Sequence, residues 1–501
     1  MAAATPAHPQ KFQPRRTFVR SENIRGITSI GAYIPRRRLQ RAAIAAAHAW
    51  AFPALKSQAK GERAICAWDE DVVTMAVEAG RDCLRGLSRT SWQALNLAST
   101  SAPFADLNHA ALVAAALRLN LNVAAMDFAS STRVGLSALI EACRAREGEQ
   151  LVIAADKRGA KPGSVQEMQY GCGAAALACG SGEAVFARLL GAESLTVPFF
   201  DHFRASGQSA DYHWEERWVR DEGLAKLVPQ AVSALLERLA LTPDRITWFG
   251  LSGGPARSDA AIAKALKIAP QSLLPDLQAG VGDTGTAHSL LQLLAALERA
   301  QPGDIIVIAA FAQGCEVAAF EMIKPLPASA RRGLAGSLAD RVEESAYLRL
   351  LANEGQLELD WGMRAEVDQK TALTQLYRAS DQILGLVGGR CSSCGAVQFP
   401  RLPNCVNCAA SDTQQPYALD EVPARIATHT ADWLQYSPAP PLLMGLVQFD
   451  GGARLLMEIV DVGADGLEVG TPLSMRFRIK ERDRQRGWNR YFWKASPMSA
   501  V

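Results

Sequence analysis

The sequence predicts an α/β protein with a duplicated core, followed by a small metal-binding ribbon and a β-barrel. Three observations predict this organisation. Strand-like and helical runs alternate over residues 26–325 in an order that occurs twice, two C-x-x-C pairs lie close together near residue 400, and short strand-like runs follow them. With 501 residues, 49% hydrophobic and 21% charged, the chain is long enough for two or three domains.

The composition is typical of a globular protein without a polyanionic partner, because the formal net charge is only +2. The six cysteines outside the C-x-x-C pairs are scattered, unlike the dense framework of a secreted protein. We find no apolar run of transmembrane length and no signal peptide with a hydrophobic core. We therefore expect a cytoplasmic protein that does not bind membranes.

Residues 1–25 are expected to form a disordered or surface-draped arm, since they are basic, contain three prolines and have no apolar period. A transit peptide is the alternative interpretation. The core follows at residues 26–325. Its expected strands are 27–35, 95–104, 122–129, 149–159, a hairpin of strands in 173–191, 245–255 and a strand pair in 303–323. Its expected helices are 38–50, 69–86, 135–145, 258–268 and 282–300.

The two C-x-x-C pairs predict a zinc site. Cys391 and Cys394 form one pair, Cys405 and Cys408 the other, and ten residues separate the pairs. Two such knuckles deliver four thiolates to one tetrahedral Zn²⁺, and four sulfurs leave no open position, so the zinc is expected to be structural. A disulfide pair or a redox C-x-x-C is the alternative.

The remaining segments divide the C-terminal third of the chain. Residues 326–387 are expected to be a helical connector, with a solvated linker as the alternative, and residues 388–412 the zinc ribbon. Residues 413–497 carry short strand-like runs typical of an OB-type barrel.

The basic tail at residues 476–494 is the most distinctive part of the expected barrel. Its eight Lys or Arg residues are interleaved with aromatic residues. They suit single-stranded nucleic acid, coenzyme A phosphates and adenine, a partner surface, or simply solvent. The near-neutral charge of the whole chain makes nucleic acid the least favoured of these.

Several motifs of the core resemble a known family. The segments GITSIGAYIPRRRL, DEDVVTMAVEAGRDCL, DYHWEERWVRDEG, VGDTGTAHSLLQLLAALE and PGDIIVIAAFAQG look like the hydroxymethylglutaryl-CoA synthase branch of the thiolase superfamily, which also contains ketoacyl synthase III. The resemblance covers residues 26–325. It implies a thiolase fold of two similar halves in five layers, an acyl-CoA site at their junction and a homodimer.

The C-terminal region carries a second resemblance. RCSSCGAVQFP, the second knuckle pair and GTPLSMRF are similar to the rubredoxin-like zinc ribbon plus OB proteins associated with thiolases and hydroxymethylglutaryl-CoA synthases, over about residues 373–497. In that setting such modules assemble with a thiolase, so the resemblance implies a thiolase partner.

The family's catalytic cysteine is not present where the motif places it. The pattern D-x-x-x-S-C-x-x-G aligns with Asp127, Ser131 and Gly135, which puts Thr132 at the cysteine position. A hydroxyl there acts as a nucleophile only with an adjacent base.

The other members of the implied site also differ. LSGGPAR at residues 251–257 lacks the family's histidine, Asp283 stands where an asparagine is expected, and Thr100 where a glutamate is expected. The candidate catalytic residues are therefore Thr132, Ser131, Asp283 and His202. His213, His288, Cys172 and Cys315 are weaker candidates, for which a structural role is the simpler interpretation.

These observations predict an accessory subunit of an acyl-CoA acyltransferase or thiolase complex, with a coenzyme A thioester as substrate and the acylated cysteine on a thiolase partner. The reaction would be β-ketoacyl-CoA thiolysis or the reverse Claisen condensation. Two alternatives are an autonomous synthase-like acyltransferase of revised mechanism, using Ser131, Thr132 or a histidine, and a non-catalytic scaffold or nucleic-acid-binding OB protein.

Overall fold

The computed structural model describes residues 24–498 except 256, 329–330, 367–371 and 464–465. The predicted arm at residues 1–25 therefore lies, up to residue 23, outside the described residues. In the part that is described, no helix has both the length and the apolar content needed to cross a membrane.

A nine-stranded sheet forms the core, in the order β11-β12-β13-β8-β1-β7-β6-β4-β5. Its strands are β1 (Arg25–Tyr33), β4 (Trp92–Ala98), β5 (Ala124–Phe128), β6 (Glu149–Lys157), β7 (Cys172–Ser181), β8 (Ala187–Thr196), β11 (Trp248–Ser252), β12 (Ile305–Phe311) and β13 (Gly314–Met322). β1 and β8 pair only at Gly26–Arg188 and Ile27–Ala187, so the sheet folds back there into two layers.

The two halves of the sheet repeat one pattern of pairing. In the order β1-β7-β6-β4, two antiparallel pairs are followed by a parallel pair, and β8-β13-β12-β11 has the same sequence of directions. α4 precedes β6 just as α9 precedes β12. The duplication expected from the sequence is therefore present in the topology.

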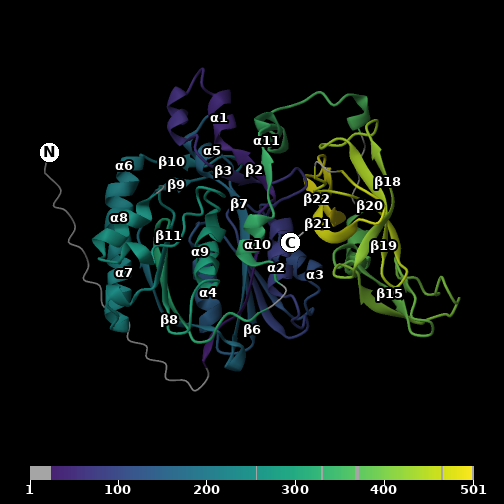
Figure 1. The fold of residues 1–501 in the computed structure, drawn as a ribbon, viewed down its shortest axis with the longest axis horizontal. Helices are drawn as coiled ribbons and strands as arrows, with labels where there is room; N and C mark the ends of the chain where they lie inside the picture. The colour runs from purple at the N-terminus through teal and green to yellow at the C-terminus, as the bar shows by residue number, and fades with distance from the viewer. Residues whose placement is uncertain (1–23, 256, 329–330, 367–371, 464–465, 499–501) are drawn as a thin grey trace.

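Helices cover both outer faces and fill the space between the halves. They are α2 (Val72–Cys83), α3 (His109–Ala116), α4 (Val134–Arg144), α7 (Ala225–Leu239), α8 (Ser258–Ala265) and α9 (His288–Leu297). Figure 1 shows five layers from left to right: α7 with α8, the β8–β11 half, α4 with α9, the β6–β7 half, and α2 with α3. The structure thus has the thiolase-like layered α/β fold, and α4 and α9 meet at its centre.

Two predicted helices begin later than expected, for local reasons. The predicted helix at 69–86 starts at Val72, because Asp71 is its N-cap and accepts a hydrogen bond from the backbone of Thr74. The predicted helix at 282–300 starts at His288. Gly282 and Gly285 have φ of 93° and 57°, which is left-handed backbone that cannot continue an α-helix.

The connector is only partly helical, and its first half belongs to the core. α10 (Gly333–Ala339) and α11 (Tyr347–Asn353) flank a short strand, β14 (Val342–Glu344). β14 pairs in parallel with β2 (Arg37–Gln40), which also pairs with β3 (Glu62–Ile65). The strand β2 occupies the start of the predicted helix at 38–50, and α1 (Arg41–Ala47) follows it. Smaller elements are α5 (Val165–Gln169), β9 (His202–Phe203), β10 (Tyr212–His213), α6 (Glu216–Trp218), α12 (Leu373–Arg378) and α13 (Ser380–Ile383).

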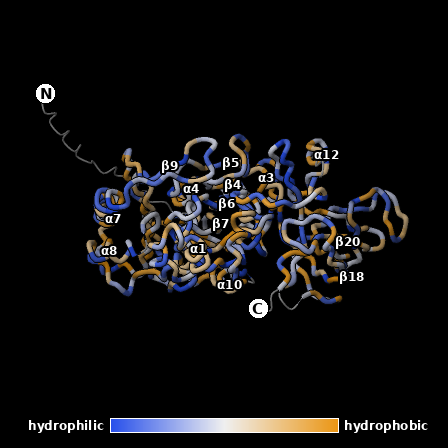
Figure 2. Tube along the Cα trace, turned by 90° about the horizontal axis from the view of Figure 1, so that it is seen from above, coloured by the Kyte–Doolittle hydropathy of each residue, from blue (hydrophilic) through white to orange (hydrophobic). Residues whose placement is uncertain are grey.

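The ribbon and the barrel are two small sheets beyond the connector. The ribbon pairs β16 (Val397–Gln398), β15 (Val387–Cys391) and β17 (Gln414–Ala418). The barrel has the order β20 (Arg454–Glu458), β19 (Leu442–Phe449), β18 (Ala424–Asp432), β21 (Pro472–Asp483) and β22 (Trp488–Pro497). A bridge between Ile459 and Ala495 joins its two edges. Seen from above in Figure 2, the barrel strands β18 and β20 lie at the opposite end of the molecule from α7 and α8.

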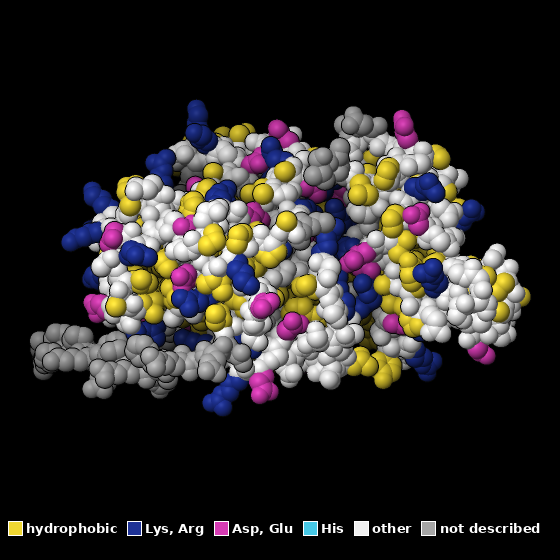
Figure 3. Space-filling model, turned by 60° about the horizontal axis from the view of Figure 1, so that its bottom comes forward, with side chains coloured by type: hydrophobic (Ala, Val, Ile, Leu, Met, Phe, Trp, Pro, Cys, Tyr) yellow, Lys and Arg dark blue, Asp and Glu magenta, His cyan; other side chains and the backbone are white. Residues whose placement is uncertain are grey.

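The basic tail at residues 476–494 fixes the barrel to the core instead of facing solvent throughout. Arg478 is 1% exposed and contacts Glu70 at 2.9 Å, and the buried Lys494 contacts Asp69 at 2.9 Å. One hydrophobic cluster also runs from α2 and α3 into the barrel strands. Figure 3 shows Lys and Arg side chains gathered where the core meets the C-terminal part of the chain. Part of the predicted binding surface is therefore an interdomain contact.

Replacing Glu78 by glutamine should lower the stability of the fold at neutral pH. The stability of the variant should also change less with pH in the acid range. Burial alone would raise the pKa of Glu78, but the charges of Arg81 and Arg476, at 3.0 and 3.1 Å from its carboxylate, hold the pKa at about 2. Because this folded-state pKa is below the ordinary value, the ionised Glu78 contributes fully to the free energy of unfolding above about pH 4.5. This contribution is lost as the pH falls toward 2. The depression corresponds to a contribution on the order of 3 kcal/mol.

The measurement is the thermal midpoint of E78Q and of wild type between pH 7 and pH 3. We expect a deficit at pH 7 that narrows below pH 5, and no effect from the exposed control E147Q. A deficit of the same size at every pH would contradict the assignment.

Candidate active site and metal centre

The turn between β5 and α4 carries the residues that the motif aligns with a nucleophile. Ser130 has φ of 80°, a left-handed conformation that is uncommon for serine, so the turn is a sharp elbow. The Ser131 hydroxyl donates to the carbonyl of Ala312 at 3.4 Å. Thr132 is 8% exposed, and its hydroxyl makes no hydrogen bond with any described residue. Neither hydroxyl contacts a base among the residues that the structure describes.

The outer anchors of the motif hold this elbow in place. The carboxylate of Asp127 accepts hydrogen bonds from the backbone N–H groups of His109 and Ala110, at the start of α3. Gly135 lies against the backbone of Thr286, where an added Cβ would be 2.1 Å from the carbonyl oxygen. Only glycine allows α4 to approach the segment before α9 this closely.

A buried carboxylate, Asp156, lies at the carboxyl end of β6, beside the segment where the family's glutamate is expected. It accepts hydrogen bonds from the hydroxyls of Ser99, Thr100 and Ser101 at 2.7–3.0 Å. It also accepts from the backbone N–H groups of Thr100 and Thr286, both at 2.8 Å. Thr100 therefore donates hydrogen bonds to the buried carboxylate of Asp156. Its own hydroxyl does not replace a catalytic base.

Arg158 organises the next part of the network. Its guanidinium contacts Asp283 at 3.0 Å and Asp211 at 2.8 Å, and it donates to the Tyr170 hydroxyl at 2.6 Å. That hydroxyl also contacts the His213 ring. Asp283, the residue at the family's asparagine position, is thus paired with a cation.

The charges in this network set the protonation of its members. Burial alone would raise the pKa of Asp283, but Arg158 more than offsets this and lowers the pKa below the ordinary value. Burial, assisted by the positive charge of Arg158, lowers the pKa of His213 to about 4. At neutral pH Asp283 is therefore ionised and His213 is a neutral imidazole.

His202 has the geometry of an oriented base. Its Nδ1 lies 2.6 Å from the Asp201 carboxylate, and its ring stacks on His213 with centroids 5.5 Å apart. The backbone N–H of Gln313 donates to Asp201 at 3.1 Å, and the carbonyl that precedes Gln313 accepts from Ser131. The other ring nitrogen, Nε2, makes no hydrogen bond with a described residue. An Asp–His pair of this kind leaves one nitrogen for proton transfer.

The structure brings two of the four predicted residues into one network. Asp283 and His202 belong to the same network, Ser131 contacts the adjoining segment, and Thr132 lies next to Ser131 without contacting the network. Several members of the network were not predicted to be functional from the sequence, namely Asp156, Arg158, Tyr170, Asp201 and Asp211, together with Arg204, which contacts Asp211 at 2.8 Å. Asp156 and Arg158 could have been predicted from the sequence, because they lie at the carboxyl end of a buried strand, where binding sites of α/β proteins form.

Three of the weaker candidates, His288, Cys315 and Cys172, have structural environments. His288 is 2% exposed and its Nδ1 lies 3.3 Å from the hydroxyl of Thr284. Burial raises the pKa of the Cys315 thiol, which therefore stays protonated. A hydrogen bond from Cys66 lowers the pKa of Cys172, but both thiols are buried. None of these groups lies at the elbow between β5 and α4.

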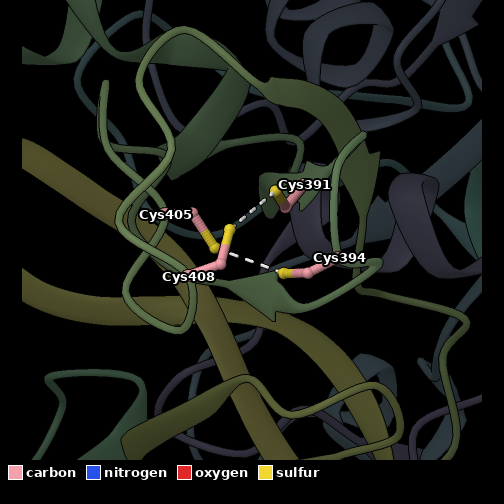
Figure 4. Close-up of side chains that lie close together, drawn as sticks. All are labelled: Cys391, Cys394, Cys405 and Cys408. Atoms are coloured by element: carbon pink, nitrogen blue, oxygen red, sulfur yellow. Dashed lines mark hydrogen bonds between the residues drawn. The ribbon is translucent and has the colours of Figure 1, made fainter.

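The four knuckle cysteines converge on one point, as Figure 4 shows. Their sulfur atoms all lie within 4.8 Å of one another. Cys391 and Cys408 are 3.8 Å apart, and Cys394 and Cys405 3.6 Å. A zinc–sulfur bond of about 2.3 Å gives a tetrahedron whose sulfurs are separated by about 3.8 Å, whereas a disulfide needs about 2.05 Å. The four residues fit a structural zinc site.

Both knuckles have the same backbone geometry. The carbonyl of Cys391 accepts from Gly395, and the carbonyl of Cys405 accepts from Ala409, each at 2.9 Å. Gly395 and Ala409 have positive φ, which closes the tight turns. The repeated turn explains why two short segments can each aim two sulfurs at one ion.

Comparison with known families supports the metal assignment. Residues 384–414 match the family described as "ChsH2, rubredoxin-like zinc ribbon domain". This range includes all four cysteines. The ribbon is therefore a rubredoxin-like zinc ribbon, and its zinc is structural.

Curated relatives match the core. The "Hydroxymethylglutaryl-CoA synthase" of Methanopyrus kandleri is 28% identical over 340 residues, 66% of this chain and 96% of that protein. The protein of the same name from Thermococcus gammatolerans is 27% identical, over 64% of this chain and 93% of its own length. The core is thus similar to these synthases over almost their entire length.

Solved structures show the same fold at lower identity. "HMG_CoA synthase complexed with CoA" aligns with a TM-score of 0.55 and 17% identity, over 70% of this chain and 94% of that one. 3-oxoacyl-[acyl-carrier-protein] synthase III from Aquifex aeolicus aligns with a TM-score of 0.53 and 19% identity, over 59% and 99%. The core has a thiolase-like fold with synthase relatives, and the zinc ribbon is a separate addition to it.

Proposed function

We propose that this chain is an acyl-CoA acyltransferase subunit whose acylated cysteine is supplied by a thiolase partner. The observation that carries this proposal is the elbow between β5 and α4, where Thr132 stands in place of the nucleophile, is 8% exposed and contacts no base among the described residues. The similarity to hydroxymethylglutaryl-CoA synthases supports a coenzyme A thioester as substrate. The zinc ribbon and barrel would hold the core against the partner.

The proposed reaction is carbon–carbon acyl transfer. In thiolysis, the partner's cysteine thiolate attacks the β-carbonyl carbon of a β-ketoacyl-CoA, and the bond between carbons 2 and 3 breaks. The electron pair stays on carbon 2 of the departing thioester, which takes a proton. Coenzyme A thiolate then displaces the acyl group from the cysteine, and the reverse sequence is a Claisen condensation.

This chain's own residues would bind the thioester and manage the proton. His202, oriented by Asp201 at 2.6 Å, is the group suited to exchange a proton with carbon 2. Asp283 is held by the guanidinium of Arg158, so this ion pair would shape the site.

A second copy of the chain is the proposed partner at the sheet edge. β5 is the last strand of the nine-stranded sheet, and three of its five residues are exposed. Met126, on this strand, is 46% exposed. An uncovered edge strand of this kind pairs readily with another strand, and a homodimer would cover it.

The Asp201–His202 pair also favours one competing function, an autonomous acyltransferase. In that mechanism His202 would activate Ser131 or Thr132, and this chain would itself carry the acyl group. The nucleic-acid alternative is less supported, because Arg478 and Lys494 of the basic tail are buried against core carboxylates.

An acyl-CoA assay with and without a co-expressed thiolase of the same organism tests the proposal. We expect turnover only with both proteins, and less than about a twofold change for T132A or S131A, since neither hydroxyl would form a covalent bond. The matched control is T90A at an exposed site. Turnover by the chain alone that falls about a hundredfold or more in T132A or S131A would overturn it.

A further inference from the structure

A cavity of about 550 Å³ lies where the barrel meets the connector and the core. Trp68 comes from the core, Trp361 and Ala365 come from the segment after α11, and the barrel supplies the remaining lining. This volume is in the range of cavities that hold small molecules. The cavity is built from the barrel, the connector and the core, and it includes none of the candidate catalytic residues.

Aromatic rings form much of the wall. Trp361 and Tyr436 meet edge to face with centroids 5.5 Å apart, and Trp361 remains 38% exposed. Trp68 and Phe492 also line the cavity. Large aromatic faces that are only partly covered are suited to stack on a flat ring.

Cations gather at one side, at the end of β21. Lys480, Arg482 and Arg484 line the cavity, and all three are exposed. Neither Lys480 nor Arg484 forms a salt bridge with any residue that the structure describes. Lys480 Nζ lies 5.6 Å from the centre of the Phe492 ring. Because neither charge is paired with a carboxylate of the described residues, both are available to an anion.

The acidic residues of the lining already have cationic partners. Glu481 contacts Arg490 at 3.0 Å and Asp483 contacts Arg486 at 2.9 Å. Glu458 contacts the buried Lys494 at 2.9 Å. The charge left unpaired in the cavity is consequently positive.

We propose that this cavity is a nucleotide site, in which a base stacks on Trp361 while phosphate contacts Lys480 and Arg484. Free mononucleotides and the adenosine end of coenzyme A share this chemistry. The aromatic side chains of the wall favour a ligand with a flat ring. The cations at one side, which form no salt bridge with described residues, favour a phosphate group. Binding here requires neither acyl transfer nor a partner subunit, so the proposal stands apart from the proposed function.

Calorimetric titration of the full chain with ADP, 3′,5′-ADP, coenzyme A and phosphopantetheine tests the site. We expect saturable binding of the ligands that contain adenosine, and none of phosphopantetheine. ADP binding indicates a free nucleotide as the source, whereas binding of only 3′,5′-ADP and coenzyme A indicates the coenzyme. Binding of phosphopantetheine and coenzyme A without either ADP, or no binding at all, would overturn the proposal.

Variants locate the binding in this cavity. We expect W361A and the double variant K480A/R484A each to weaken the affinity for the adenosine ligands by about fivefold or more, through lost stacking and lost phosphate contacts. The matched controls are M363A, at an exposed neighbour of Trp361, and R425A, at an exposed barrel cation outside the lining. Unchanged affinity in both test variants, with unchanged thermal midpoints, would refute the site.

Discussion

Replacing Cys391 and Cys405 by serine is expected to remove the zinc ion, unfold the ribbon and abolish assembly with the proposed thiolase partner. Each substitution takes one sulfur from a site whose four sulfurs lie within 4.8 Å, and two serines leave too few thiolates for Zn²⁺. The ribbon has only short strands, and a structural zinc contributes about 10 kcal/mol or more to the folding of such a domain. Metal analysis should find about one zinc per wild-type chain and almost none in the variant.

The control for this prediction is S393A, in the same knuckle but outside the sulfur cluster. It should keep its zinc and should still co-purify with the proposed thiolase partner. The core should retain its own thermal transition in the cysteine variant, because the ribbon contributes no residue to the candidate active site. Retained assembly by a zinc-free variant would contradict the role that we assign to the ribbon.

Replacing Arg478 by alanine is expected to cost about 3–5 kcal/mol and to loosen the barrel from the core. Arg478 is 1% exposed and contacts Glu70 at 2.9 Å, Asp461 at 3.0 Å and the Tyr33 hydroxyl at 3.0 Å. Its loss leaves buried carboxylates without their cation. Calorimetry should show a lower midpoint, with the barrel unfolding before the core.

Two further variants separate the ion pair from simple loss of volume. R490A removes the partner of Glu481 in a surface salt bridge, and the Arg490 side chain is 40% exposed. This change should lower the free energy of unfolding by less than about 1 kcal/mol. The double variant R478A/E70Q should be less destabilised than the sum of its single changes, because it removes both charges of one contact. Strict additivity, or equal effects of R478A and R490A, would show that this contact does not hold the domains together.

The layered fold and the zinc ribbon could be predicted because their signals are local. Apolar periodicity identified the strands of both halves, and the spacing of Cys391, Cys394, Cys405 and Cys408 alone indicated four ligands for one ion. The starts of α2 and α9 were missed because single residues decide them. Asp71 caps the first of these helices, and left-handed glycines delay the second.

The network around Arg158 could not be predicted in the same way. Arg158 meets Asp283 across 125 positions of the chain, and no local pattern reports such a contact. The basic tail was ambiguous for the same reason. The local sequence around Arg478 is typical of a surface cation. Only the fold shows that it contacts Glu70, which lies more than 400 positions earlier in the chain.

The most direct test of the central claim is to find which protein carries the acyl group. The chain and a thiolase partner are mixed with a β-ketoacyl-CoA, quenched in acid and measured by intact mass spectrometry. We predict an acyl mass increment on the thiolase, located at a cysteine, and none on this chain. An acyl group on this chain, at Ser131 or Thr132, would contradict the account.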